Sequence, residues 1–230
     1  MKALAEADGH IFLPNPEPEG PVDYVLICME PSLGRWARSP EEAKSKVDAG
    51  FRNFLFSTEV SILHFCIRRY LCKPTQQYHI TDLSKGAMHV KVAGRERTQR
   101  WDRWYPLLQD EINLVAKSDA AIVAVGKDVF QYLERRGFQR LCRIIHYSGL
   151  NGRARKREIE PCKDAFEEFR GSVSIKDVAA TAEAVFRKAR VPTEMRDKEL
   201  SRLSGSDLTD SRHMLIFSYK SAFESVRLKG

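Results

Sequence analysis

Chemically versatile side chains stand at the ends of four short apolar runs of the chain: Glu30, Asp82, Lys127 and His146. Two carboxyl groups, an amine and an imidazole that meet on one edge of a sheet can exchange protons with a substrate and stabilise charge that develops in a reaction. These residue types are compatible with many reactions. By themselves they predict an α/β enzyme and no particular substrate.

The apolar runs are the elements that must position these residues, and they cover 24–29, 78–83, 121–125 and 142–146. Near-continuous apolar runs of this length are typical of strands buried on both faces of a parallel sheet. Segments with helical periodicity, such as 60–71, lie between them. The alternation predicts an α/β fold, specifically a three-layer α/β/α arrangement around a four-stranded parallel central sheet. Ligands of such sheets bind outside the carboxyl ends of the strands, which is where the four side chains fall.

The chain of 230 residues is expected to form a single domain spanning 1–230. Residues 22–157 carry the strands and motifs. Residues 158–230 show no strand pattern and are expected to form C-terminal helices over 164–170, 175–190 and 211–228, packed on the same sheet, with a polar stretch at 191–210 between the last two. A monomer is expected.

Charge and cysteine content narrow the class of protein. The chain has 38 Lys and Arg against 31 Asp and Glu, a net charge of +7 that is compatible with a polyanionic partner. No apolar run is long enough for a membrane span, and the N-terminus has no signal-peptide pattern, so we expect a cytoplasmic protein, nucleoid-associated if bacterial. The five cysteines are scattered and show no zinc or iron–sulfur ligand spacing, which predicts free thiols and no iron–sulfur cluster.

The first strand end places Glu30 before Pro31, which turns the chain and lacks a backbone donor. A carboxylate held by such a turn could orient a water molecule or stabilise a developing cation. The alternative is a solvent-exposed glutamate at the start of a loop.

The fourth strand end joins His146 to a short loop containing Leu150 and then to four cations at positions 153, 155, 156 and 157. Lysine and arginine at this density favour phosphate contacts. An apolar residue between small neighbours resembles the wedges that proteins insert between base steps. The alternative is a solvated basic loop with Leu150 in the core. The basic segment 86–100 is a second candidate loop, whereas Trp101 and Trp104 are expected to pack in the core.

Three segments in this order resemble the motifs of the uracil-DNA glycosylase superfamily. Cys28-Met29-Glu30-Pro31 fits the strand-and-turn frame of the first motif, and His146-Tyr147-Ser148-Gly149-Leu150-Asn151 matches the second motif at its histidine, serine and leucine. Tyr78-His79-Ile80-Thr81-Asp82-Leu83 resembles the strand end between them. The resemblance covers about residues 22–157 and implies hydrolytic removal of uracil, and of other deaminated or damaged bases, from single- or double-stranded DNA.

The resemblance also implies roles for individual residues. Glu30 would position the hydrolytic water, and His146 would donate a hydrogen bond to the base oxygen and stabilise the leaving base. Asp82 would bind the Watson–Crick edge of the base, and Phe56, or Phe54 as the second choice, would stack on it. Such enzymes take the target base out of the helix before they act on it.

The remaining implied contacts concern the turn and the DNA backbone. Pro31 would line the substrate site beside Glu30, and Leu150 would fill the gap left by the flipped nucleotide. The backbone contacts would come from Ser32, Ser148, Arg153 and Arg155.

The sequence departs from the family pattern at several of these positions. Glu30 stands where Asp or Asn is more frequent, and Tyr147 and Gly149 replace two prolines of the second motif. Asp82 replaces an asparagine. An ionised carboxylate only accepts hydrogen bonds, whereas uracil offers one donor and carbonyl acceptors. Asp82 must therefore be protonated, or the base selectivity differs.

Three alternatives remain open at this point. One is a catalytically silent nucleic-acid-binding protein of the same fold, and another is an unrelated α/β hydrolase of nucleosides or nucleotides. The third is an amine nucleophile, Lys85 or Lys127, with strand cleavage, although an ordinary lysine is protonated at neutral pH.

Overall fold

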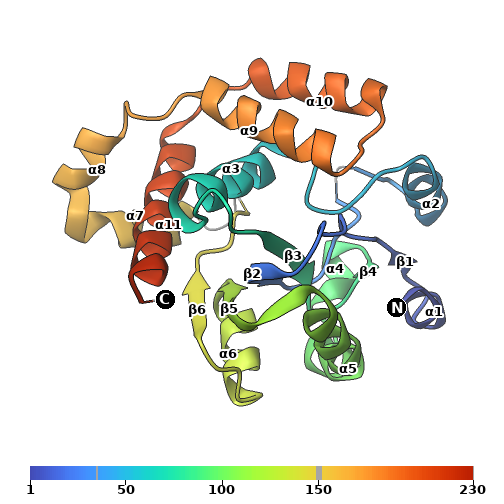
Figure 1. Cartoon of the computed structure of the whole chain (residues 1–230). Coiled ribbons are helices and arrows are strands. Elements are labelled where there is room, and N and C mark those ends of the chain that lie inside the picture. Colours follow the sequence, from blue (N-terminus) through green and yellow to red (C-terminus); the bar gives the residue numbers. More distant parts are fainter. Residues whose placement is uncertain (35, 149–151, 230) are drawn as a thin grey trace. The chain divides into compact units, whose positions relative to one another are not determined.

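The structure, a computed structural model, describes residues 1–34, 36–148 and 152–229 of the chain. Its larger sheet has four parallel strands in the spatial order β3-β2-β5-β6 (Figure 1). The strands are β2 (Val22–Cys28), β3 (Tyr78–Asp82), β5 (Ala116–Val125) and β6 (Leu141–Ile144). The α/β class and the four-stranded parallel sheet are thus confirmed, each strand lying on one of the four apolar runs.

Strand β2 lies between β3 and β5 and is almost entirely buried. Its pairing with β3 runs from Tyr24 opposite Tyr78 to Cys28 opposite Asp82, so the two strands end side by side. Two further short strands, β1 (Ile11–Phe12) and β4 (Gly86–Ala87), form an antiparallel pair. The sequence did not predict this pair because two-residue strands carry no periodicity.

The chain divides into two compact units. Unit 1 comprises Met1–Asn53, Gln77–Ala124 and Asp128–Leu141, and unit 2 comprises Phe54–Gln76, Val125–Lys127 and Cys142–Gly230. Each unit draws on segments from distant parts of the chain.

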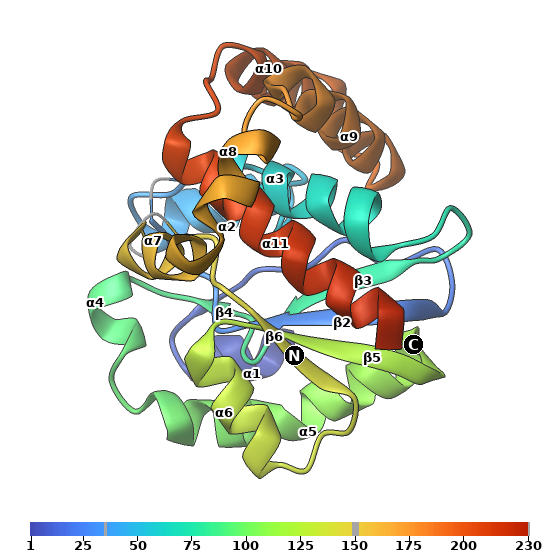
Figure 2. The same ribbon diagram turned by 90° about the vertical axis from the view of Figure 1, so that its left-hand side faces the viewer.

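Unit 1 is built around an apolar core in which two helices pack on one face of the sheet (Figures 1 and 2). Its helices are α1 (Lys2–Ala7), α2 (Pro40–Asp48), α4 (Val90–Ala93), α5 (Arg97–Val115) and most of α6 (Lys127–Arg135). Trp101 of α5 and Tyr132 of α6 meet edge to face at 5.3 Å over the strand residues of the core. Trp101 and Trp104 are buried, which confirms their predicted packing role. The segment 86–100, expected to be a loop, instead contains β4, α4 and the first turn of α5.

Unit 2 is mainly helical. Its elements are α3 (Thr58–Cys66), the π-helix η1 (Ile67–Leu71), α7 (Gly152–Ile159), η3 (Glu160–Cys162), α8 (Lys163–Phe169), α9 (Ile175–Lys188), α10 (Thr193–Ser204) and α11 (Asp210–Lys229). Helix α11 packs against α3, η1 and α7 and buries Tyr219 and Phe223 completely. Ser174 and Asp177 form a capping box that fixes the start of α9. The C-terminal helices are confirmed, and α10 occupies most of the stretch that was expected to be a polar connection.

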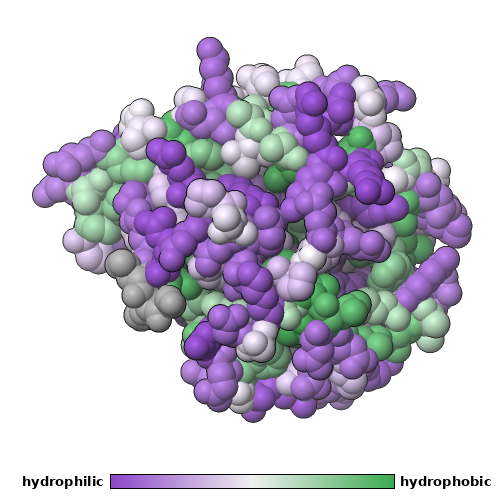
Figure 3. Space-filling view, viewed as in Figure 1, coloured by the Kyte–Doolittle hydropathy of each residue, from purple (hydrophilic) through white to green (hydrophobic). Residues whose placement is uncertain are grey.

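Among the described residues, the exposed large hydrophobic side chains are Val92 and Leu114. Hydrophilic residues cover most of the face in Figure 3, with smaller hydrophobic groups between them. No described helix is both long and apolar enough to cross a membrane. All five cysteines are free thiols, and Cys28, Cys66 and Cys72 are buried.

Candidate functional site

The carboxyl ends of β2 and β3 bring Glu30 and Asp82 into one neighbourhood of unit 1. The two segments stay paired beyond the strands, because Leu83 N–H donates to Cys28 O at 2.9 Å and Ser84 N–H to Met29 O at 3.3 Å. The strand-end prediction is therefore confirmed for these two residues. Pro31 is buried and Ser32 half-buried in the same turn.

Asp82 is a buried carboxyl group, 3% exposed, that accepts a hydrogen bond from Asn53 Nδ2 at 2.6 Å. Burial raises its pKa to about 8, and the negative charges of Glu30 and Glu111 add to this effect against the opposing charge of Lys85. At neutral pH the group is thus a protonated acid that can both donate and accept a hydrogen bond. The sequence had left open whether Asp82 is protonated, and its environment favours the protonated form.

A buried polar network lies beside Asp82 and centres on Glu111 of α5. Glu111 accepts from Lys85 Nζ at 2.7 Å, from His79 Nε2 at 2.9 Å and from the Thr81 hydroxyl at 2.9 Å. Burial alone would raise the pKa of Glu111, but the hydrogen bond from His79 and the charge of Lys85 lower it to about 2. Lys85 is committed to this ion pair, which argues against its use as an amine nucleophile.

We expect Glu111→Gln to reduce the free energy of unfolding by about 3–5 kcal/mol, because the change leaves the buried Lys85 ammonium without its counter-charge. The melting temperature should fall by roughly 10 °C in thermal unfolding at pH 7. In the native protein the contribution of Glu111 is present above pH 4.5 and lost as the pH falls toward 2. Glu134→Gln, on an exposed position of α6, is the control. Equal melting temperatures for both variants would contradict the assignment.

The Glu30 carboxylate is 3% exposed and engaged by side chains of α5. Arg97 Nε donates to Oε1 at 3.0 Å and Trp101 Nε1 to Oε2 at 2.9 Å, while the Arg100 guanidinium lies 3.6 Å from Oε2. The alternative of an exposed glutamate at a loop start is thus wrong. A carboxylate has about four lone-pair sites, so these donors orient the group and still leave acceptor capacity.

His146 follows β6 in unit 2 and is held as a neutral imidazole. Its Nδ1 accepts a hydrogen bond from the Ser148 N–H at 3.0 Å, which puts the ring proton on Nε2, and Tyr147 stacks on the ring at 4.4 Å. Burial lowers the pKa of His146 to about 4, with a further contribution from the charge of Arg155. Gly126 has φ of +105°, a conformation that favours glycine, and a Cβ there would lie 3.6 Å from the His146 Cβ.

The basic segment after His146 is a helix rather than a loop. Arg155 is 2% exposed in α7, and its guanidinium donates to Tyr147 O at 2.6 Å, Ser148 O at 2.9 Å and Ser211 Oγ at 2.9 Å. Arg155 therefore supports the backbone that carries His146, and the expected direct phosphate contact is corrected to this internal role. Arg153, Lys156 and Arg157 are exposed on the same helix. Leu150 lies outside the described residues.

The two candidate stacking rings also belong to unit 2. Phe54 is 4% exposed, has a left-handed φ of 55°, and its carbonyl accepts from His64 Nε2 at 2.7 Å. Phe56 is partly exposed and stacks on Phe186 of α9 at 5.9 Å. Of the two rings, Phe56 is the more exposed.

Sequence reasoning missed the partners of these residues: Asn53, His79, Arg97 and Glu111. For Glu111 a signal exists, because it lies seven residues after Trp104 and three after Leu108, on the buried stripe of α5. No group of three His, Cys, Asp or Glu side chains within the described ranges is placed to hold a metal ion.

Known proteins provide no further guide. No protein-family model matches this chain, and no curated protein or solved structure is significantly similar to it. The function must be inferred from the site itself.

Proposed function

We propose that this chain is a monofunctional uracil-DNA glycosylase, acting as a monomer on a three-layer α/β/α fold similar to that superfamily. The observation that carries the proposal is His146, whose Nδ1 is capped by the Ser148 N–H at 3.0 Å so that Nε2 carries the proton. Cleavage of an N-glycosidic bond leaves negative charge on the departing base. A neutral imidazole that donates to the base oxygen stabilises this charge where it develops.

The protonated state of Asp82 supports recognition of uracil. A neutral carboxyl group offers an O–H donor and a carbonyl acceptor side by side, as the amide of asparagine does. Uracil presents a carbonyl oxygen next to an N–H on its Watson–Crick edge, so one carboxyl group satisfies both. Asn53, which donates to Asp82 Oδ2 at 2.6 Å, fixes the orientation of that group.

Glu30 is proposed to orient the attacking water and to stabilise the positive charge that develops on the sugar. Arg97 and Trp101 hold its carboxylate at 3.0 and 2.9 Å. Because both oxygens are already oriented, little reorganisation is needed when a water binds to a remaining lone pair. The reaction as proposed uses water alone and needs no metal or organic cofactor.

We propose two kinds of DNA contact, one with the phosphate backbone and one inside the helix where the flipped nucleotide has left. Ser32, Ser148 and the exposed Arg153 would contact phosphates, and Leu150 would fill the vacated position in the helix. Extraction of the base costs a few kcal/mol, which stacking on Phe56 would offset in part.

The proposal is tested with the full chain and end-labelled oligonucleotides that contain one uracil, single- and double-stranded. We expect hot alkali to cleave the strand at the uracil position after incubation, because the enzyme leaves an abasic site. The matched thymine oligonucleotide is the control. Intact uracil strands after alkali, for single- and double-stranded substrates alike, would refute the activity. Cleavage before alkali would instead indicate an amine nucleophile, for which Lys127 is the exposed candidate.

A second candidate function is a catalytically silent DNA-binding protein of the same fold. The burial of the Glu30 side chain, which is 3% exposed, favours it, because water must be able to reach a catalytic carboxylate. This candidate predicts salt-sensitive DNA binding with no base release. The same alkali assay, combined with a binding titration at two salt concentrations, separates the two functions.

A further inference from the structure

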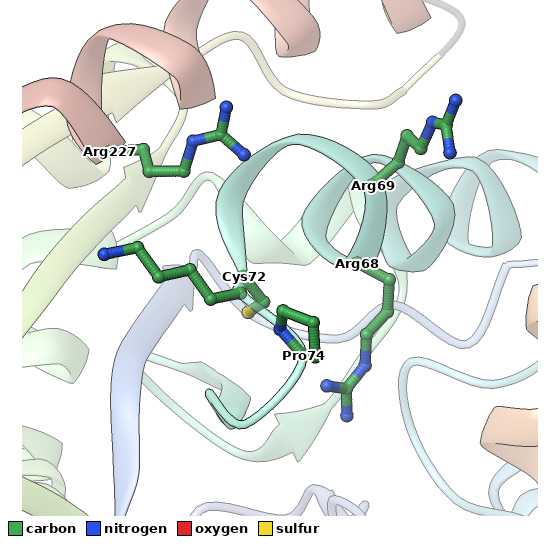
Figure 4. Close-up of a pocket in the computed structure, with 6 residues that line it drawn as sticks. Arg68, Arg69, Cys72, Pro74 and Arg227 are labelled. Atoms are coloured by element: carbon green, nitrogen blue, oxygen red, sulfur yellow. The ribbon is translucent and has the colours of Figure 1, made fainter.

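A pocket of unit 2 is lined by cations and contains no acidic residue. It lies where η1 and the turn after it meet the C-terminal part of α11, and its volume is about 370 Å³ (Figure 4). The lining residues are Arg68, Arg69, Cys72, Lys73, Pro74 and Arg227. This volume falls in the range of small-molecule sites.

The helix that forms one wall has an unusual geometry. Residues Ile67–Leu71 form a π-helix that ends with the Cys72 N–H donating to Ile67 O at 2.8 Å. Short π-helical segments of this kind occur frequently at functional sites. Arg68 and Arg69 leave the wide turn in opposite directions, while Arg227 extends from α11 toward it (Figure 4).

The turn that forms the floor of the pocket is preorganised. Gln76 N–H donates to Lys73 O at 3.0 Å, and Lys73 N–H donates to Gln76 Oε1 at 2.9 Å. Arg68 Nη1 donates to Gln76 O at 3.1 Å. These bonds hold the backbone beside Pro74, so a ligand meets a wall that is already formed.

In the part of the chain that the structure describes, Arg69, Lys73 and Arg227 form no side-chain hydrogen bond and no ion pair within 4.0 Å. Asp177 is near enough to Arg69 for the arginine charge to lower its pKa, but its carboxylate is hydrogen-bonded to Ser174 in the capping box. Glu224 pairs with Lys220 Nζ at 2.7 Å. Cations around one cavity repel one another, and an anion relieves this repulsion.

The pocket is separate from the His146 segment. Tyr219 of α11 donates to Ile145 O at 2.9 Å, and Arg227 lies eight residues further along the helix. At 1.5 Å per residue, this places the two positions about 12 Å apart along the helix axis. The pocket therefore represents an additional site and does not depend on the proposed glycosylase activity.

We propose that this pocket binds a phosphoryl group, supplied by a small phosphorylated molecule or by the terminal phosphate of a nucleic acid. Guanidinium groups suit phosphate because their planar donors match its oxygens, and Lys73 adds a compact charge. The side chains of Pro74 and Cys72 give the pocket an apolar part, which can contact the organic portion of a ligand.

The test measures binding of pyrophosphate to the full chain by isothermal titration calorimetry, with chloride adjusted to constant ionic strength. We expect saturable binding with one site, and at least tenfold weaker binding by the double variant Lys73→Ala/Arg227→Ala. The charge-matched control is Lys176→Ala/Lys198→Ala, two exposed positions on α9 and α10 of the same unit. Circular dichroism melting confirms that both variants fold; if the double variant does not, Arg227→Gln alone replaces it.

Two further probes identify the source of the phosphoryl group. Tighter binding of a nucleoside monophosphate than of the nucleoside indicates a small ligand, and tighter binding of a 5′-phosphorylated than of a 5′-hydroxyl oligonucleotide indicates a nucleic-acid end. No saturable binding of any phosphorylated probe up to 10 mM, or equal weakening by the control variant, would overturn the proposal.

Discussion

Replacement of His146 by glutamine is expected to lower the rate of base release from a uracil-containing oligonucleotide by about 10²–10³-fold, the usual cost of losing one donor to a developing oxyanion. Glutamine retains an N–H donor but cannot present it from the position that the Ser148 N–H and the Tyr147 ring give to the imidazole. Affinity for the oligonucleotide should change little, because the proposed hydrogen bond strengthens only as the base departs.

The pH dependence of the wild-type rate provides an independent measurement. The pKa of His146 is lowered to about 4, so the ring is neutral above pH 5 and does not titrate near 6.5. We therefore expect a flat rate between pH 5 and 7 in single-turnover experiments. An inflection near pH 6.5 that disappears in His146→Gln would show that the cationic ring acts instead.

His89→Gln is the matched control for this variant, because His89 is an exposed histidine of unit 1. It should release base at the wild-type rate. If His146→Gln also remains within threefold of the wild type while the protein is active, the assignment of His146 is wrong and the activity resides elsewhere.

The strands were predictable from the sequence because each contains a short, largely apolar run, and the central strand β2 is almost entirely buried between β3 and β5. Helix α10 was not predictable, because its buried residues are only Glu199 and Leu203, and Glu199 pairs with Arg202 at 2.8 Å. A helix that buries so little apolar surface shows weak periodicity. Its formation depends on α9, against which it packs, more than on its own sequence.

The meeting of Glu30 and Asp82 was predictable because parallel strands end at the same edge of a sheet. The hydrogen-bond partners and the protonation state of each carboxyl group were not predictable. They depend on α5, which supplies Arg97 and Trp101 to one carboxylate and Glu111 to the network beside the other. Those contacts depend on how α5 packs on the sheet, and the hydrophobic pattern of one sequence does not reveal that packing.

Arg155 illustrates how secondary structure changes the interpretation of a charge run. Four cations in five residues suggest a phosphate-binding loop, but a helix distributes them over several faces. Arg155 and Ile159 lie four residues apart on the buried face, whereas Arg153, Lys156 and Arg157 remain exposed. Once α7 is known to be a helix, the sequence spacing itself shows which of the cations lies on the buried face.

Asp82→Asn is expected to stabilise the protein at alkaline pH. The folded-state pKa of Asp82 is about 8 against an ordinary 3.8, so the folded state retains a proton that the unfolded chain releases. The contribution of Asp82 to the free energy of unfolding therefore decreases as the pH rises between about 4 and 8, by about 1.4 kcal/mol per pH unit. Asparagine removes this pH-dependent loss of stability, and the melting temperature at pH 8 should rise by roughly 10–20 °C.

The control for stability is Asp119→Asn, an exposed position on β5, which should leave the pH dependence of melting unchanged. A melting temperature of Asp82→Asn equal to or below that of the wild type at pH 8 would show that the carboxyl group is ionised in the folded protein. This measurement does not depend on any catalytic activity.

The same substitution separates stability from base recognition. Above pH 8 the ionised Asp82 can no longer donate to the base carbonyl, and its charge repels that oxygen, so wild-type base release should fall about tenfold per pH unit. The amide of asparagine keeps both a donor and an acceptor at all these pH values, and Asp82→Asn should therefore retain its rate at pH 9. Loss of activity in Asp82→Asn at pH 7, together with the expected gain in stability, would mean that Asp82 is protonated but takes part in the chemical step. Equal alkaline decline in both proteins would place the titrating group elsewhere.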